Sequence, residues 1–251
     1  MIKKLALLAL LGGFTALAAD EALPPAQTIL DRYIEVTGGR AAWEKRKTEV
    51  ATGTVEFTAQ GIKGSLTHYS ADPDKSYTLM EIAGIGKIEQ GESEGVAWEN
   101  SVIQGARVKS GEEKAQSLRE EGVFNAPLHW HEIYPKAETV GLEKVDGEDC
   151  YKVILTPVEG KPVTVYFQKK SGLEVKTSTV AVSPNGEFEV EATSGNYKEY
   201  GGVLMPTTMI EKLAGQELKM TIQNVKVNEE IPASRFEPPA EVKALLSKTA
   251  R

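Results

Sequence analysis

The tripeptide His129-Trp130-His131, followed by Glu132, is the stretch with the clearest potential for metal chemistry. Two histidines on one strand can hold zinc, and an added carboxylate would suit a metal-assisted hydrolase. The surrounding segment is predicted to be helical, however, and residues two apart do not face each other on a helix. His68 lies in a separate predicted strand, and the chain has no HExxH or paired CxxC motif. A packing or surface role is favoured and no cofactor is expected, with a hydrolase using His129 and His131 as the alternative.

The other candidates for chemistry fit turns or packing better than catalysis. The acids within 146–149 flank a glycine, and Glu229-Glu230 lie just before a proline, which is typical of turns. Gly84-Ile85-Gly86 lacks the third glycine and the following helix of a dinucleotide loop, and no G-x-S-x-G elbow is present. The single Cys150 cannot form an internal disulfide and fits a buried strand position. The sequence therefore predicts a protein that is not an enzyme.

The N-terminus has the pattern of an export signal. Two lysines precede an apolar run from Leu5 to Ala19, and Ala16-Leu17-Ala18 offers the small residues of a cleavage site. The run is shorter than the ~20 residues needed to cross a bilayer, and no later apolar run reaches that length. We therefore expect a signal peptide over residues 1–18, one domain over residues 19–251, a periplasmic location and no transmembrane segment in the mature chain.

The charge of the chain argues against one class of partner. The formal net charge is −7, and no basic patch stands out along the sequence. Nucleic-acid binding depends on lysine and arginine clusters that neutralise phosphates. Nucleic acid is therefore not an expected partner, and adsorption to anionic membrane surfaces is disfavoured as well.

Most of the chain alternates between apolar and polar residues with the two-residue period of β-strands. From Cys150 to Asn228, strand-length segments follow one another across short turns, which predicts antiparallel neighbours. A similar series from Glu49 to Asn100 raises the total to about eleven to thirteen strands, more than a flat sheet holds without curling. A change of parity near Gln223-Asn224 predicts a bulge. The predicted fold is mainly β, with a single curved antiparallel sheet.

A few helical segments accompany the strands. Apolar residues recur at helical spacing from Ala26 to Thr37, and a shorter helix is predicted from Ala41 to Arg46. A central helical insertion covers 114–121 and 126–134 and separates two runs of strands, and the chain closes with an amphipathic helix over 240–248. We expect the first two helices to cover an apolar surface of the sheet.

This order of elements, together with several turns, resembles a known family. The turns are Lys169-Lys170-Ser171-Gly172-Leu173, the stretch 197–202 followed by Pro206, and Asn228 followed by 231–232 and 236–238. The chain is similar over most of its mature length to the LolA/LolB-like family of periplasmic outer-membrane lipoprotein-sorting proteins, although it is longer and has extra early strands. The resemblance implies an unclosed β half-barrel with helices covering its concave apolar face. In the carriers of that family the concavity receives the acyl chains of a lipoprotein.

The strand alternation predicts which side chains line the concave face. They are Phe57, Leu66, Met80 (with Leu79 as its competitor), Trp98, Val153, Val165, Phe188, Met209 and Met220. Ile29, Tyr33 and Ile34 on the first helix would form a lid over them. Methionine adapts to irregular apolar ligands, and cavities lined in this way bind apolar molecules.

The resulting functional hypothesis is a periplasmic carrier or chaperone for the acyl chains of a lipid or lipoprotein. Lid helices would occupy the hollow when it is empty and yield it to acyl chains, since each buried methylene contributes about 0.8 kcal/mol. The alternatives from other classes are the metal-assisted hydrolase and an envelope module that presents a sheet edge to a transient protein partner.

Overall fold

The computed structural model describes residues 22–249, so the predicted signal peptide lies outside the described residues. The helices are α1 (Ala26–Val36), α2 (Arg40–Lys45), α3 (Gly111–Glu120), α4 (Trp130–Ile133) and α5 (Ala240–Thr249), with 3-10 turns η1 (Ala126–His129) and η2 (Ala233–Phe236). The strands are β1 (Thr48–Phe57), β2 (Ile62–Ala71), β3 (Lys75–Ile82), β4 (Gly86–Ser93), β5 (Val96–Ser101), β6 (Gly105–Val108), β7 (Lys136–Val145), β8 (Glu148–Thr156), β9 (Val163–Gln168), β10 (Glu174–Ser183), β11 (Gly186–Gly195), β12 (Lys198–Tyr200), β13 (Val203–Met205), β14 (Thr208–Leu213) and β15 (Gln216–Val227).

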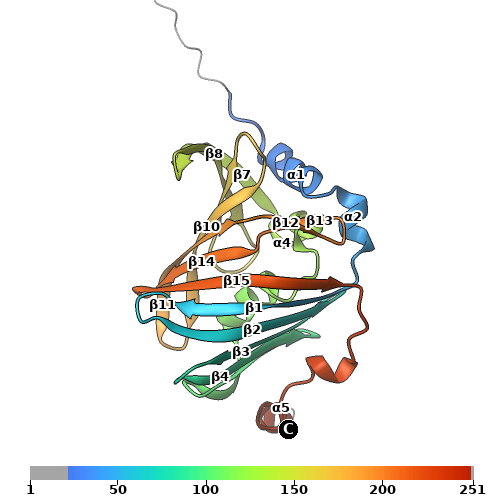
Figure 1. Cartoon of the computed structure of the whole chain (residues 1–251), viewed down its shortest axis with the longest axis vertical. Coiled ribbons are helices and arrows are strands. Elements are labelled where there is room, and N and C mark those ends of the chain that lie inside the picture. The colour runs from blue at the N-terminus through green and yellow to red at the C-terminus, as the bar shows by residue number, and fades with distance from the viewer. Residues whose placement is uncertain (1–21, 250–251) are drawn as a thin grey trace, which may run out of the picture.

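Thirteen of the strands form one antiparallel sheet, in the order β6-β5-β4-β3-β2-β1-β15-β14-β11-β10-β9-β8-β7. The last strand of the chain pairs with the first, because β15 lies beside β1 and joins the two runs of hairpins. Figure 1 shows the sheet curving along its length. Its edges, β6 and β7, do not pair with each other, so the sheet is not closed. The predicted fold class, a curved and unclosed antiparallel sheet, is confirmed.

The helical insertion connects the two free edges of the sheet. It runs from the end of β6 through α3, η1 and α4 to the start of β7. In Figure 1 this green segment lies within the curve of the sheet, and α3 contacts both β5 and β10. The insertion therefore spans the opening that an unclosed sheet leaves.

The predicted bulge in β15 is present. Thr52 pairs with Asn224 while Gly53 pairs with Ile222, so Gln223 is the extra residue. A bulge flips the parity of the strand and increases its local twist. Leu218, Met220 and Ile222 consequently share one face with Val225, beyond the bulge, and all of them lie on the inner side of the sheet.

The outer side of the sheet has a core of its own, which the prediction for Trp98 did not allow for. Trp98 is 1% exposed and packs with Tyr77, Phe236 and Val242, so η2 and α5 cover it. Its ring lies on Gly91, where an added Cβ would be 2.7 Å from the indole. The inward assignment of Trp98 is wrong, because η2 and α5 cover the outer face of β5 and bury its apolar side chains there.

Candidate functional site

A cavity of about 320 Å³ lies between α1, the helical insertion and the inner face of β8 to β11. We call it the α1 cavity. Its apolar wall includes Leu30, Leu155, Val165, Phe167, Val190 and Ala192. The strands supply these residues at two-residue intervals, as expected for one face of a pleated sheet.

A second cavity of about 470 Å³ lies against β1 to β4, β14 and β15. All four methionines that follow Met1 line it, and we call it the methionine cavity. They are Met80, Met205, Met209 and Met220. Met209 and Met220 are direct cross-strand partners, and Leu66 pairs with Met80. Unbranched thioether side chains adapt to irregular apolar shapes, so this wall suits a ligand without a fixed conformation.

A third cavity of about 220 Å³ lies between the two larger ones. It shares Tyr33 and Glu120 with the α1 cavity, and His68 and Met205 with the methionine cavity. Glu211 lines both of the larger cavities. The three cavities therefore adjoin one another along the inner face of the sheet, and together we call them the hollow.

Most of the predicted inward residues lie at this hollow. Leu66, Met80, Met209 and Met220 line the methionine cavity, and Val165 lines the α1 cavity. Val153 is fully buried next to Val165 in the core under α1. Phe57 pairs with the lining residue Leu218, and Phe188 has the parity of Val190 and Ala192, so both phenylalanines are on the inner face as predicted, although neither lines these three cavities. Leu79, the competitor of Met80, packs instead with the outer core around Tyr77.

The predicted lid residues lie on the inner face of α1. Ile29 is buried against the strand core, Ile34 packs with Trp43 and Val203, and Tyr33 lines the α1 cavity. The Tyr33 ring contacts Phe167 edge-on, with 5.6 Å between the ring centroids. Arg32 fixes the helix from outside by donating to the carbonyl oxygens of Lys169 and Lys170, at 3.0 and 2.9 Å. The turn at 169–173, one of the turns on which the family resemblance rests, thus holds α1 in place through these two hydrogen bonds.

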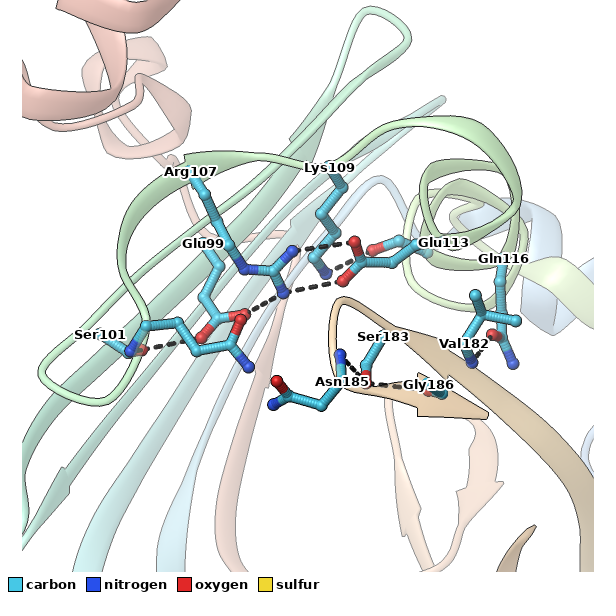
Figure 2. A network of polar contacts seen from close by, with 12 residues as sticks. Glu99, Ser101, Arg107, Lys109, Glu113, Gln116, Val182, Ser183, Asn185 and Gly186 are labelled. Carbon is cyan, nitrogen blue, oxygen red and sulfur yellow. Dashed lines mark hydrogen bonds and ion pairs between the residues drawn. The ribbon is translucent and has the colours of Figure 1, made fainter. Parts of the chain in front are cut away.

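α3 is attached to the sheet largely by polar contacts. On one side Arg107 bridges Glu99 of β5 and Glu113 of α3, as Figure 2 shows. On the other side, Gln116 accepts a hydrogen bond from the backbone N–H of Val182 at 3.0 Å. The α3 helix therefore holds two distant parts of the sheet together across the hollow.

A buried cluster around Glu92 adds to this attachment. The Glu92 side chain is 1% exposed and accepts hydrogen bonds from Ser76 at 2.6 Å and from Ser117 of α3 at 2.5 Å. Lys109 donates to Ser117 at 2.7 Å and lies 3.5 Å from the Glu92 carboxylate. Because the groups of the cluster satisfy one another, the helix is docked by a specific polar contact rather than by apolar packing alone.

Five carboxyl groups of the described residues line the hollow: Glu49, which pairs with Arg46, and Glu120, Glu121, Glu174 and Glu211. Burial raises the pKa of Glu174 to about 7, and burial together with the nearby Glu92 and Glu120 carboxylates raises that of Glu121 to about 7. Burial also raises the pKa values of Glu120 and Glu211. An apolar wall that disfavours ionisation is the common cause. The hollow is thus acidic in composition but only partly charged near neutral pH.

Glu174→Gln is expected to stabilise the protein at pH 8 and to do so much less at pH 5. The folded pKa of about 7 exceeds the ordinary 4.5, so between these values the folded state keeps a proton that the unfolded state releases. The free energy of unfolding of the wild type therefore falls as pH rises through this window, by up to about 3 kcal/mol, and the glutamine variant lacks this loss. Urea denaturation at both pH values measures it. The control Glu189→Gln, at an exposed position, should leave the free energy of unfolding unchanged at both pH values. If the free energy of unfolding of the wild type and of Glu174→Gln changed equally between pH 5 and pH 8, the raised pKa of Glu174 would be refuted.

The histidine motif does not form a metal site among the described residues. His129 contacts Glu132 at 3.3 Å, while His131 stacks on Trp130 with 3.5 Å between ring centroids. His68 lies across the hollow, where it hydrogen-bonds Thr78 at 2.9 Å and burial lowers its pKa. No group of three or more histidine, cysteine or acidic side chains within residues 22–249 is arranged to hold a metal ion.

Several polar residues of the hollow were not predicted. Arg119, Trp130, Glu174 and Glu211 all line the α1 cavity. Glu211 shares the two-residue parity of Met209, so its sequence position did signal an acid on the apolar face. Arg119 gave no such signal, because its inward position depends on how α3 crosses the opening.

An unclosed antiparallel half-barrel whose concave side is covered by helices, with a hollow beneath them, defines a LolA-like fold. No family model and no curated protein matches the chain.

Solved structures with this fold are similar over most of the chain. A LolA superfamily protein from Nitrosomonas europaea has a TM-score of 0.58 and 15% identity, covering 86% of this chain and 99% of that one. A DUF1329 family protein from Desulfovibrio piger has a TM-score of 0.56 and 17% identity, covering 86% and 98%. A putative outer membrane lipoprotein-sorting protein domain from Vibrio parahaemolyticus has a TM-score of 0.53 and 16% identity, covering 88% and 99%. The predicted resemblance is confirmed at the level of the fold.

Proposed function

We propose that this chain is a periplasmic carrier that binds the acyl chains of a lipid or lipoprotein in its hollow. The observation that carries the proposal is that the α1 cavity and the methionine cavity adjoin each other, with the third cavity between them, along one apolar face of the sheet. A long, narrow and flexible apolar ligand fits such a space better than a compact one. The likeness in fold to a lipoprotein-sorting domain supports the same class of ligand.

The lid and the insertion provide a means of loading. α1 covers one end of the hollow through Ile29 and Tyr33, and α3 crosses its opening through polar contacts. Buried acyl chains contribute about 0.8 kcal/mol per methylene, so a few methylenes outweigh the contacts that hold a lid in place. Transfer to an acceptor then follows the difference in affinity and needs no covalent step. Within residues 22–249, no helix has the length and apolar character needed to cross a bilayer.

Binding of a synthetic triacylated lipopeptide tests the proposal directly. The full chain after export is titrated with the lipopeptide and with the same peptide lacking its acyl chains, and complexes are counted by native mass spectrometry. A one-to-one complex with the acylated form alone supports the carrier. Equal binding of both peptides would instead favour a protein-interaction module, and binding of neither would refute the carrier. Stoichiometric zinc lost on His131→Ala would favour the hydrolase.

A further inference from the structure

Arg119 is a buried cation with unused hydrogen-bond donors at the α1 cavity. It lies in the last turn of α3, its side chain is 8% exposed, and it lines the cavity wall. Nη1 donates to the carbonyl oxygen of Glu159 at 3.0 Å. Nε and Nη2 have no hydrogen-bond partner of good geometry among the described residues, although Nη2 lies 3.7 Å from the Glu120 carboxylate and the guanidinium also interacts with the Tyr134 hydroxyl. Leaving buried donors unpaired costs about 1–3 kcal/mol each, so an acceptor supplied by a ligand would be favoured.

Trp130 provides a second unused donor on the same wall. It is the first residue of α4 and lines the α1 cavity, and its indole Nε1 is buried without a hydrogen-bond partner in the described part of the chain. The face of its ring is stacked on His131, which fixes the orientation of the indole. Arg119 and Trp130 come from different helices of the insertion, α3 and α4, and both line this cavity.

The charge of the cavity decides which acceptor fits these donors. Among the described lining residues Arg119 is the one cation, and Glu120, Glu174 and Glu211 line the same cavity. The carboxylate of a free fatty acid would add another negative charge to a weakly solvated site that already holds three acids. An ester or amide carbonyl offers lone pairs to the same donors without that charge.

We propose that Arg119 and Trp130 bind the neutral carbonyl oxygen of an esterified or amide-linked acyl chain, whose tail extends into the hollow. This assignment rests on the proposed carrier function and specifies its ligand class. It makes the site selective for acyl groups attached to a larger molecule over free fatty acids. The acyl tail contributes binding affinity through its contacts with the apolar walls. The carbonyl group sets the position of the head of the acyl chain in the α1 cavity.

Competition among three sixteen-carbon probes tests the assignment. Methyl palmitate, palmitate and hexadecane each displace the neutral dye N-phenylnaphthylamine from the wild-type protein. The expected order is methyl palmitate tightest, with hexadecane about tenfold weaker because it lacks the acceptor, and palmitate also weaker than the ester. Arg119→Met and Trp130→Phe should each reduce the ratio of methyl palmitate affinity to hexadecane affinity several-fold.

Hexadecane is the matched control, because a variant that misfolds or closes the hollow loses the hydrocarbon as well as the ester. Equal affinity of the wild type for ester and hydrocarbon, unaffected by Arg119→Met, would overturn the carbonyl site. Tighter binding of palmitate than of the ester would overturn the preference for a neutral head. Failure of all three probes to displace the dye would refute the carrier itself, and the carbonyl site with it.

Discussion

Ala192→Trp is expected to weaken acyl binding by at least about tenfold while the protein stays folded. Ala192 is a small residue on β11, and its side chain lines the α1 cavity, whose volume is about 320 Å³. An indole at this position occupies space that an acyl tail would use. Displacing two to four methylenes at about 0.8 kcal/mol each costs about 2–3 kcal/mol of binding free energy, which is a loss of roughly thirtyfold to a hundredfold. Displacement of N-phenylnaphthylamine by methyl palmitate measures the change.

The matched control is Glu189→Trp. Glu189 lies on the same strand with the opposite parity, is exposed, and points away from the hollow. The Glu189→Trp variant adds the same side chain to the same strand without entering the cavity. Its affinity for methyl palmitate should therefore equal that of the wild type. Unchanged affinity in a folded Ala192→Trp variant would mean that the ligand does not occupy the α1 cavity.

Lys109→Met is expected to lower the free energy of unfolding by about 3–5 kcal/mol. Lys109 is the cation of the buried cluster that joins α3 to the sheet, 3.5 Å from a Glu92 carboxylate that is 1% exposed. Without it, the carboxylate keeps only its two hydroxyl donors, from Ser76 and Ser117. Breaking a buried ion pair by removing one partner leaves an uncompensated charge, which is why the expected loss is large. Urea denaturation measures it.

Two companion variants separate the buried charge from general damage. Lys63→Met removes the partner of Glu56 in a surface pair whose lysine is 69% exposed, so its effect should be below about 0.5 kcal/mol. The double variant Lys109→Met/Glu92→Gln removes both charges and should recover a large part of the stability. A double variant no more stable than Lys109→Met would show that packing, not charge, accounts for the loss.

The strands, helices and curvature of the sheet could be predicted from the sequence because the periods of its apolar residues are local signals, whereas the half-barrel arrangement was implied by the resemblance. Strand alternation, the extra residue at Gln223 and the helix over Ala26–Val36 all follow from short windows of the chain. The same alternation placed Leu66, Met80, Met209 and Met220 together, because hairpin register carries parity from one strand to the next.

The polar part of the site depends on contacts that no local window contains. Trp98 was assigned inward because alternation identifies an apolar face without showing which side of the sheet it is on, and α5 covers the outer side here. Arg119 enters the hollow only because α3 crosses between β5 and β10. The raised pKa of Glu174 results from burial by elements distant in the chain. Such features require the tertiary structure.

Quenching of single tryptophans by a brominated acyl ester tests most directly whether the hollow receives an acyl chain. The chain has three tryptophans, of which Trp130 lines the hollow and Trp98 is buried on the outer side. Two variants each retain one of them, with phenylalanine replacing the other two. A methyl palmitate brominated along its chain should quench Trp130 saturably and leave Trp98 unaffected. Quenching of Trp98 alone, or equal quenching of both, would contradict acyl binding in the hollow.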